Sequence, residues 1–311
     1  STLRHTLFPY TTLFRSFTVP RDYGAGDTRS EETVTLPVKV AYRLERGAHA
    51  LQVKLTVDNR AKDHRLRACF PTGLETETSI ADSHFDVVER AVEVPDSTGW
   101  VERAYGTHPL RSFAALNDGE NGLAVMPKGL FEYEALDDRD RTLALTLIRG
   151  CRIKLMVSEE KQTELPDQGI QCPGTHTFEY AVMPHSGSWQ KAGLLNYAAS
   201  LTVPVRAAQT GQGHGDLPHE AGFLVLEDPV VHVTAVKPAE DGDGIVIRLF
   251  NPTHSPREVP LRFGRPVSTA TRCRMDETPE TSLKIDDGRV TDKVNGKEIA
   301  SYRITLGEIS D

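Results

Sequence analysis

Cysteine is scarce in this sequence, and the few copies present are too scattered to form a recognisable framework. They are Cys69, Cys151, Cys172 and Cys273, and none belongs to a Cys-x-x-Cys pair. Scattered cysteines of this kind are typical of small buried apolar residues in a reducing compartment. A Cys151–Cys172 disulfide is conceivable, but no spacing pattern supports it.

Long apolar runs and an excess of positive charge are also missing. No uninterrupted apolar stretch is long enough to cross a bilayer as a helix. The 36 Lys and Arg residues are outnumbered by 44 Asp and Glu residues, which gives a formal net charge of -8. An acidic chain without a basic block binds phosphate backbones poorly, so we expect neither a nucleic acid nor a membrane as partner.

Familiar catalytic and metal-binding motifs are absent as well. The chain has no His-x-His, His-Glu-x-x-His, Gly-x-Ser-x-Gly, P-loop or dinucleotide motif. His214 and His219 fall in a Gly-rich stretch, where the fixed geometry of zinc ligands is not expected. His108 and His185 each adjoin a proline at a predicted turn, where capping or a loop hydrogen bond is the default role. We therefore expect no catalytic residue, metal site or cofactor in this chain.

The N-terminus has an unusual character. Thr6–Ser16 (TLFPYTTLFRS) looks like the in-frame translation of a common short-read sequencing adapter. It lacks the charged start and small-residue cleavage site of a signal peptide, and without such a signal we expect a cytoplasmic location. We leave Ser1–Ser16 out of the expected fold as an assembly artefact. Natural sequence upstream of Phe17 is then expected to be lost, and the chain to be a fragment.

What the sequence does contain, from Thr33 onward, is strict alternation of apolar and polar residues. The alternating apolar residues are Val34, Leu36, Val38, Val40, Tyr42 and Leu44, and after a turn Leu51, Val53, Leu55 and Val57. A period of two predicts half-buried antiparallel strands, because successive side chains point to opposite faces of a sheet. Arg67–Pro71 continues as a third strand. The pattern of Asp82–Val94 does not decide between strand, loop and helical turn.

A central stretch, His108–Arg149, carries short apolar runs between turn-forming clusters. The runs are Phe113–Leu116, Gly122–Met126 and Leu143–Ile148. Because the Gly, Asn and Asp between them tolerate tight backbone angles, this stretch predicts a meander of strands. Further strands are expected at Ile153–Val157, Thr175–Met183 and Leu201–Val205, and a helix at Gly193–Ala199.

A second group of short strands follows the Gly-, Gln- and His-rich stretch Ala207–Ala221, which has linker composition. These strands are expected at Phe223–Leu226, Val230–Lys237, Ile245–Asn251, Glu258–Phe263, Thr269–Met275, Ser282–Asp286 and Ile299–Leu306. Asp241–Gly244 (DGDG) is a hairpin signal between two of them. Many short strands at this spacing are typical of a sandwich or a barrel, and no long helical stretch is expected, so the sequence predicts an all-β protein with two packed units.

One polar cluster stands out as a candidate site. Its members are Asp82, His84, Phe85, Asp86, Glu89 and Arg90. Carboxylates, an imidazole, an aromatic face and a guanidinium could hold sugar hydroxyls and stack on a pyranose ring. The alternative is an ordinary polar loop pinned by an internal ion pair. Likewise Trp100, Tyr133 and Trp189 could form a sugar-stacking platform or simply pack in the core.

Several stretches, in their shared order, resemble the C-terminal β region of glycoside hydrolase family 38, the α-mannosidases, in its bacterial form. The stretches are Ala81–Arg90 (ADSHFDVVER), His108–Glu134 with its GLAVMPKGLFEYE core, Leu143–Gly150, Gln171–His185 (QCPGTHTFEYAVMPH), Lys237–Asn251 (KPAEDGDGIVIRLFN) and Glu298–Ile304 (EIASYRI). Family members are built as an α/β catalytic domain, a helical segment, and large and small C-terminal β-sandwiches, the larger a supersandwich. The resemblance implies that this chain is those sandwiches, without the N-terminal catalytic domain: a large antiparallel β-sandwich over residues 17–206, a linker or long loop over 207–222 and a small β-sandwich over 223–311.

The resemblance also implies where the chemistry belongs. In the family the nucleophile is an aspartate that also binds zinc, together with a His-x-Asp pair and a further His. The resemblance places these residues in the catalytic domain, and none of their roles is carried over to a residue of this chain. The parent is expected to be a zinc-dependent retaining α-mannosidase acting on mannoside-type carbohydrates, and this fragment alone to be inactive. Two roles stay open: a structural half that completes the catalytic domain, with Asp82–Arg90 at the substrate rim, or a self-standing carbohydrate-binding module. The first predicts an exposed apolar patch where the catalytic domain docks.

Overall fold

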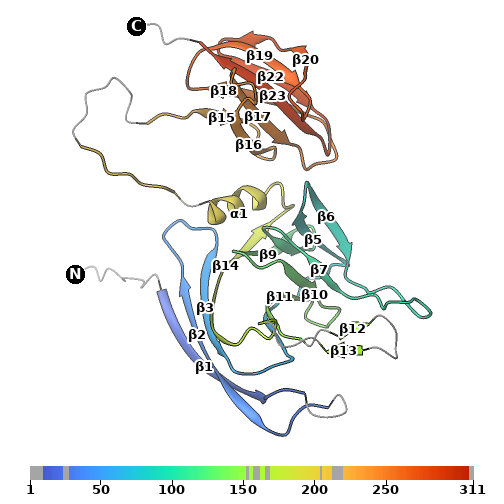
Figure 1. Ribbon diagram of the computed structural model, residues 1–311. Coiled ribbons are helices and arrows are strands. Elements are labelled where there is room, and N and C mark those ends of the chain that lie inside the picture. Colours follow the sequence, from blue (N-terminus) through green and yellow to red (C-terminus); the bar gives the residue numbers. More distant parts are fainter. Residues whose placement is uncertain are drawn as a thin grey trace. The chain divides into compact units, whose positions relative to one another are not determined.

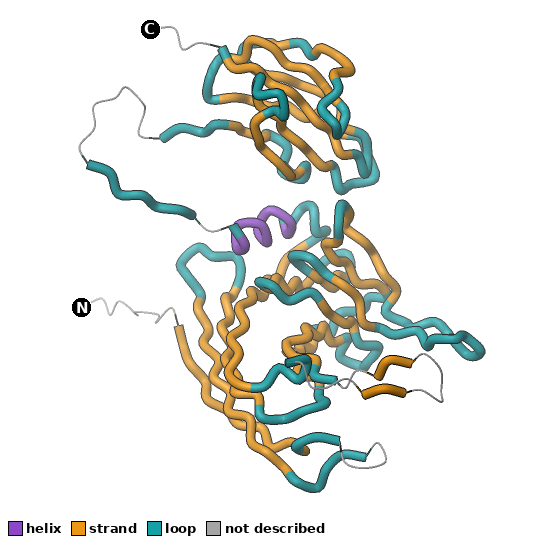
Figure 2. Tube along the Cα trace, in the orientation of Figure 1, coloured by secondary structure: helices purple, strands orange, loops and turns teal. Residues whose placement is uncertain are grey.

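The computed structural model describes residues 10–23, 28–151, 154–156, 162–164, 169–203, 205–211 and 220–307. This part of the chain is almost wholly β, with one short helix, α1 (Leu194–Thr202) (Figures 1 and 2). No helix among these residues has the length and apolar character needed to span a membrane. The chain forms two compact units, Ser1–Ser83 with Val88–Ala192, and His84–Val87 with Gly193–Asp311. The sequence-based boundary lay at residue 206, after α1 rather than before it.

The first unit contains an eight-stranded sheet and a four-stranded sheet. In spatial order the large sheet is β1 (Tyr10–Pro20), β2 (Thr33–Arg43), β3 (Leu51–Asn59), β14 (Gly174–Ser186), β9 (Asn121–Pro127), β8 (Ala114–Asn117), β5 (Thr78–Ser83) and β6 (Asp86–Ala91). The smaller sheet is β4 (Arg65–Pro71), β11 (Thr142–Arg149), β10 (Glu132–Ala135) and β7 (Thr107–Pro109). A separate ribbon pairs β12 (Lys154–Met156) with β13 (Gln162–Glu164).

Side chains from both sheets build one apolar core in this unit, as expected of a β-sandwich. The predicted alternation is confirmed in β2 and β3, where Leu36, Val38, Val53 and Val57 are buried and their neighbours face outward. Leu44 is an exception. It lies beyond the end of β2 and is half exposed, because the chain has already turned there.

Several expectations about strands need correction. The central runs are strands, but they do not form one meander, because β9 pairs with β8 and β14 while β10 and β11 belong to the other sheet. The undecided stretch Asp82–Val94 is largely a hairpin of β5 and β6. Of the expected strand Leu201–Val205, none of the described residues lies in a strand: Leu201 and Thr202 end α1, and Val203 and Val205 are exposed. Residues 153 and 157 of the expected strand Ile153–Val157 lie outside the described residues.

The cysteines also differ from expectation. All four are free thiols, but Cys273 alone is buried, while Cys151 and Cys172 are half-buried and Cys69 is exposed. Cys69 lies on β4, where Leu66, Ala68 and Phe70 take the inward positions that pack on the core. The intervening positions of the strand therefore face solvent.

Strand β1 extends the large sheet into residues that the sequence analysis left outside the fold. It pairs with β2 along its whole length, from Tyr10 opposite Arg43 to Pro20 opposite Thr33. Residues 11–18 are nevertheless exposed on both faces of the strand. This strand is thus held at the edge of the sheet by backbone hydrogen bonds, and side-chain burial contributes very little (Figure 1).

The second unit is a smaller sandwich of a four-stranded and a five-stranded sheet. The first sheet is β15 (Leu224–Leu226), β18 (Arg257–Phe263), β22 (Arg289–Val294) and β21 (Ile285–Asp286). The second is β16 (His232–Pro238), β17 (Ile245–Phe250), β23 (Ile299–Leu306), β19 (Val267–Cys273) and β20 (Pro279–Ser282). The predicted hairpin at Asp241–Gly244 is confirmed between β16 and β17. Strand β22 was not predicted from the sequence, because its two buried apolar residues alternate with polar ones.

Candidate functional site

The six candidate site residues lie on the β5–β6 hairpin, and the structure divides them between the two units. Asp82, Glu89 and Arg90 belong to the first unit, whereas His84, Phe85 and Asp86 group with the second. Phe85 takes a left-handed backbone conformation, with φ at 55°, at the tight turn between the two strands. Each residue is therefore described within its own unit.

Asp82 has the environment of a structural carboxylate. It lies in β5 and is 4% exposed. The Ser112 hydroxyl donates a hydrogen bond to its Oδ2 atom. On the main chain, the Asp82 N–H donates to the Phe113 carbonyl and the Arg111 N–H donates to the Asp82 carbonyl. These bonds fasten the segment before β8 to the hairpin, and burial leaves the carboxylate little access to a ligand.

The residues of the hairpin turn make contacts inside the second unit. The Asp86 carboxylate is ion-paired with the Lys297 ammonium. The Phe85 ring meets the Phe250 ring edge-on, with centroids 6.3 Å apart. Phe85 is still 59% exposed, and His84 is exposed as well. Together with Glu89, these two side chains are the members of the cluster that a ligand from solvent can reach.

Glu89 and Arg90 are engaged with the first unit. Glu89 accepts a 2.7 Å hydrogen bond from the Thr78 hydroxyl on the neighbouring strand. The Arg90 guanidinium is 3.4 Å from the hydroxyl of Tyr133, which also lies 3.1 Å from the Ser79 hydroxyl. Each of the three carboxylates thus has a partner within the fold, but only Asp86 is in an ion pair, and its partner Lys297 lies outside the cluster. Whether any of the six residues contacts sugar stays a prediction.

The aromatic residues considered as a sugar platform do not lie together in that way. Tyr133 is a core residue, 1% exposed. The half-buried Trp189 ring packs against Phe113, with centroids 6.5 Å apart. Trp100 alone is strongly exposed, in the connection between β6 and β7. Packing within the fold therefore accounts for Tyr133 and Trp189, and Trp100 is the exposed one of the three.

The densest polar network of the first unit was missed by the sequence analysis. It covers the outer face of the four-stranded sheet and comprises Arg65, Arg67, Glu132, Glu134, Thr146 and Arg149. Glu132 is 3.0 Å from Arg65 and 2.9 Å from Arg149. Glu134 is 2.6 Å from Arg67. In the sequence, this network is visible only as charged residues two apart on β4 and on β10. That the two sets lie side by side depends on the strand register, which the sequence does not show.

Two histidines expected at turns lie in strands instead. His185, in β14, stands opposite Gly122, and both of its ring nitrogens are buried without a hydrogen-bond partner among the described residues. Burial lowers the pKa of His185, so the ring is neutral near pH 7. Burial also lowers the pKa of His108, and the Arg90 charge lowers it further against an opposing effect of Glu134. His214 and His219 lie outside the described residues.

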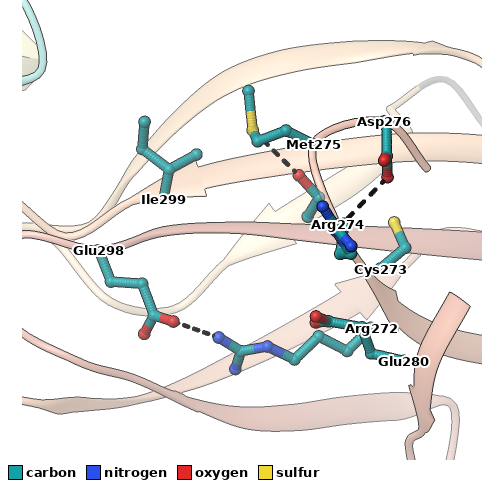
Figure 3. Close-up of a pocket in the computed structure, with 9 residues that line it drawn as sticks. Arg272, Cys273, Arg274, Met275, Asp276, Glu280, Glu298 and Ile299 are labelled. Atoms are coloured by element: carbon teal, nitrogen blue, oxygen red, sulfur yellow. Dashed lines mark hydrogen bonds and ion pairs between the residues drawn. The ribbon is translucent and has the colours of Figure 1, made fainter. Parts of the chain in front are cut away.

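A cavity of about 460 Å³ lies in the second unit (Figure 3). Its lining consists of Arg272, Cys273, Arg274, Met275, Asp276, Glu280, Glu298, Ile299 and Ser301. Arg272 is held by Glu298 and, at 2.6 Å, by Asp292. Burial alone would lower the pKa of Arg272, but these carboxylates raise it. The volume would admit a small polar molecule, yet none of the lining residues is aromatic, and aromatic faces are the usual platform for a sugar ring.

No group of three or more His, Cys, Asp or Glu side chains among the described residues is placed to hold a metal ion. The described part of the chain therefore offers no fit for zinc. Its polar clusters are ion-paired and hydrogen-bonded within the fold. Fold and clusters together define a tandem β-sandwich protein whose carboxylates serve mainly to join strands and turns.

Comparison with known proteins identifies the family. The "Glycosyl hydrolases family 38 C-terminal domain" matches residues 23–154, and the "Glycosyl hydrolases family 38 C-terminal beta sandwich domain" matches residues 230–302. The crystal structure of an α-mannosidase from Enterococcus faecalis V583 is similar over 94% of this chain and 33% of that chain, with a TM-score of 0.80 and 27% identity. The chain belongs to glycoside hydrolase family 38 and represents its C-terminal region.

Relatives in sequence agree with this assignment. A protein of Halalkalibacterium halodurans named as a candidate mannosylglycerate hydrolase is 34% identical over 232 residues, which are 72% of this chain and 24% of that protein. Human "Alpha-mannosidase 2C1" is 25% identical over 253 residues, 78% of this chain and 22% of that protein. The chain thus spans about a quarter of the length of these curated relatives.

Proposed function

We propose that this chain is the C-terminal β-sandwich portion of an α-mannosidase, and that it supports and completes the catalytic domain and its carbohydrate site. The observation that carries the proposal is the match of both sandwiches, in order, to one third of an α-mannosidase chain at a TM-score of 0.80. A region matched in this way is expected to keep the packing role that it has within a longer enzyme.

We assign the zinc-assisted, retaining hydrolysis of α-mannosides to the part of the whole protein that lies beyond this region. A retaining glycosidase needs a nucleophile and an acid–base carboxylate on either side of the scissile bond. Within the described residues, Asp82 is buried and accepts a hydrogen bond from Ser112, and Asp86 forms an ion pair with Lys297. No step of the reaction is derived through residues of this chain.

The contribution proposed for the β5–β6 hairpin is contact with the substrate rim. Its exposed members are His84, Phe85 and Glu89, and Glu89 is already hydrogen-bonded to Thr78. A sugar is therefore expected to contact the hairpin through His84 and Phe85. The imidazole can hydrogen-bond a hydroxyl, and the phenyl face can stack on the apolar side of a pyranose. The mannoside as ligand and the catalytic domain as partner belong to this proposal.

A chromogenic α-mannoside assayed with added zinc tests the proposal. The purified chain is expected to be inactive alone and to raise the activity of a separately produced catalytic portion of the Enterococcus faecalis α-mannosidase on mixing. Hydrolysis by the chain alone would overturn the assignment of the chemistry to another part of the protein. Failure to change the activity on mixing, together with mannose binding in a titration, would favour the self-standing carbohydrate-binding module instead.

A further inference from the structure

Four large apolar side chains are exposed within the connection between β6 and β7. We call residues Val94–Tyr105 the lobe. Within it Trp100 is 60% exposed, Val101 is fully exposed and Tyr105 is 73% exposed. Contiguous apolar surface rimmed by polar residues is a common mark of a protein interaction site.

The lobe is locally ordered by its own hydrogen bonds. Asp96 Oδ1 accepts bonds from the Thr98 N–H and hydroxyl at 2.9 and 2.7 Å. The Trp100 N–H donates to the Ser97 carbonyl at 3.0 Å, across a turn in which Gly99 has a φ of 83°. A positive φ favours glycine at this position, and it lets the turn present Trp100 directly after it.

A second set of contacts closes the lobe at its base. The Ala104 N–H donates a 3.1 Å bond to the Ser97 hydroxyl, which joins the two sides of the segment seven residues apart. Trp100 and Val101 lie between these anchors. The exposed side chains are thus held on a preformed turn, which lowers the entropic cost of binding a partner.

The chemistry of the surface favours a protein partner over a sugar. A sugar site combines an aromatic face with polar groups for the hydroxyls. Here the aliphatic side chains of Val94 and Val101 are exposed in the same short segment as the two aromatic rings. Trp and Tyr beside aliphatic contacts are typical of interface centres. The flanking charges are Glu93, Asp96, Glu102 and Arg103, so a partner with an apolar pocket and a basic rim is complementary.

The relatives indicate what that partner is. This chain matches 33% of the Enterococcus faecalis α-mannosidase chain, so most of that chain has no counterpart among these residues. We propose that the lobe is the surface on which the remainder of a family 38 α-mannosidase docks. This inference rests on the proposed function and adds to it the segment that makes the contact.

The test compares a double variant of the lobe with a matched control. The variant carries Trp100→Ser and Val101→Ser, and the control carries Leu44→Ser, an exposed apolar residue of the same unit at 52% exposure. Binding of each 311-residue chain to the immobilised remainder of the Enterococcus faecalis α-mannosidase is measured by biolayer interferometry. Thermal unfolding of each free chain is recorded first, and all are expected to unfold at the same temperature because the changed side chains are exposed.

The expected result is a loss of affinity on the order of tenfold or more for the lobe variant, with little change for the control. If the lobe variant and the control bind like the unaltered chain, the lobe is not the docking surface, while the proposed function stands. If the unaltered chain does not bind at all, the proposed function is contradicted and this inference with it. Dimerisation of the free chain that the lobe variant abolishes would overturn the inference in favour of a second copy as the partner.

Discussion

At the scale of single residues, the polar groups of this protein are mostly committed to holding its own strands and turns. A sequence rich in acidic residues offers many pairs that resemble a catalytic site, and only contacts can tell them apart. Asp82 illustrates this. In the sequence it belongs to a polar cluster that resembles a site, but in the structure it is buried and accepts a hydrogen bond from Ser112. Glu89, on the same hairpin, is exposed. The two carboxylates should therefore respond differently to removal.

Asp82→Ala is expected to lower the free energy of unfolding by about 1–3 kcal/mol, because the Ser112 hydroxyl loses its acceptor in a buried setting. Glu89→Ala serves as the control and should change it by less than about 0.5 kcal/mol, since the side chain is exposed. Urea denaturation followed by circular dichroism measures both. Equal effects of the two substitutions would contradict a structural role for Asp82.

Asp228, between β15 and β16, should make the second unit sensitive to acid. Burial raises the pKa of Asp228, but the N–H groups of Val231 and Val230 and the Arg257 guanidinium outweigh burial and leave it below its usual 3.8. A carboxyl with a lowered pKa stabilises the folded state above its unfolded pKa. That contribution is lost as the pH falls through the folded value.

The variant Asp228→Asn tests this dependence. It should be less stable than the unaltered chain at about pH 7, and the difference should shrink as the pH falls below the usual aspartate pKa of 3.8 and through the lower pKa of the folded state. Chemical denaturation at several pH values measures the difference. Asp286→Asn is the control, because that carboxylate is largely exposed, and it should show no such trend. A difference for Asp228→Asn that does not vary with pH would contradict the mechanism.

At the scale of elements, the alternation of apolar residues predicted strands where one face is buried. This holds for β2 and β3, since each inward position carries its own local signal. The pattern failed at Leu201–Val205, where apolar residues alone suggested a strand and no neighbouring strand exists among the described residues to pair with it. It also missed β22, in which Val290 and Val294 are too few to stand out among charged neighbours.

The close approach of β9 and β14 gives an element-scale prediction. A Cβ atom on Gly122 would lie 2.3 Å from Cε1 of His185 and 2.8 Å from Nδ2 of Asn117, so Gly122→Ala should destabilise the first unit by about 1–3 kcal/mol. Because the His185 ring makes the closest contact, adding His185→Ala should recover part of that loss. A double-mutant cycle in urea measures the coupling. Strict additivity would show that the ring is not what excludes the side chain.

At the scale of the whole molecule, each unit has its own apolar core, one centred on residues such as Leu116 and the other on residues such as Leu249. Composition and strand spacing were enough to predict an all-β protein of two packed units, and the resemblance to family 38 specified two β-sandwiches. Which strands pair was not accessible, because partners such as β3 and β14 are joined only by contacts between distant parts of the chain. The ion-pair network of Arg65 and Glu132 could not be predicted for the same reason, because it depends on the register between strands.

Separate cores predict separate effects of core substitutions. Leu116→Ala and Leu249→Ala remove fully buried side chains, and each is expected to cost about 2–5 kcal/mol in its own unit. Hydrogen exchange followed by mass spectrometry should show faster exchange in the strands around the substitution and little change in the strands of the other unit. Equal acceleration throughout the described chain after either substitution would contradict two independent cores.

The position of β1 at the edge of the sheet affects which amino-acid sequences can form this strand. Its residues 11–18 are exposed on both faces, while its backbone pairs with β2 without a break. The sheet therefore requires only that this segment adopts an extended conformation and offers its backbone N–H and C=O groups for pairing. The identities of its side chains matter little. A stretch that resembles a translated sequencing adapter meets that requirement. The same edge is thus a natural insertion point for an engineered epitope or affinity tag, displayed as a strand rather than as a loose tail.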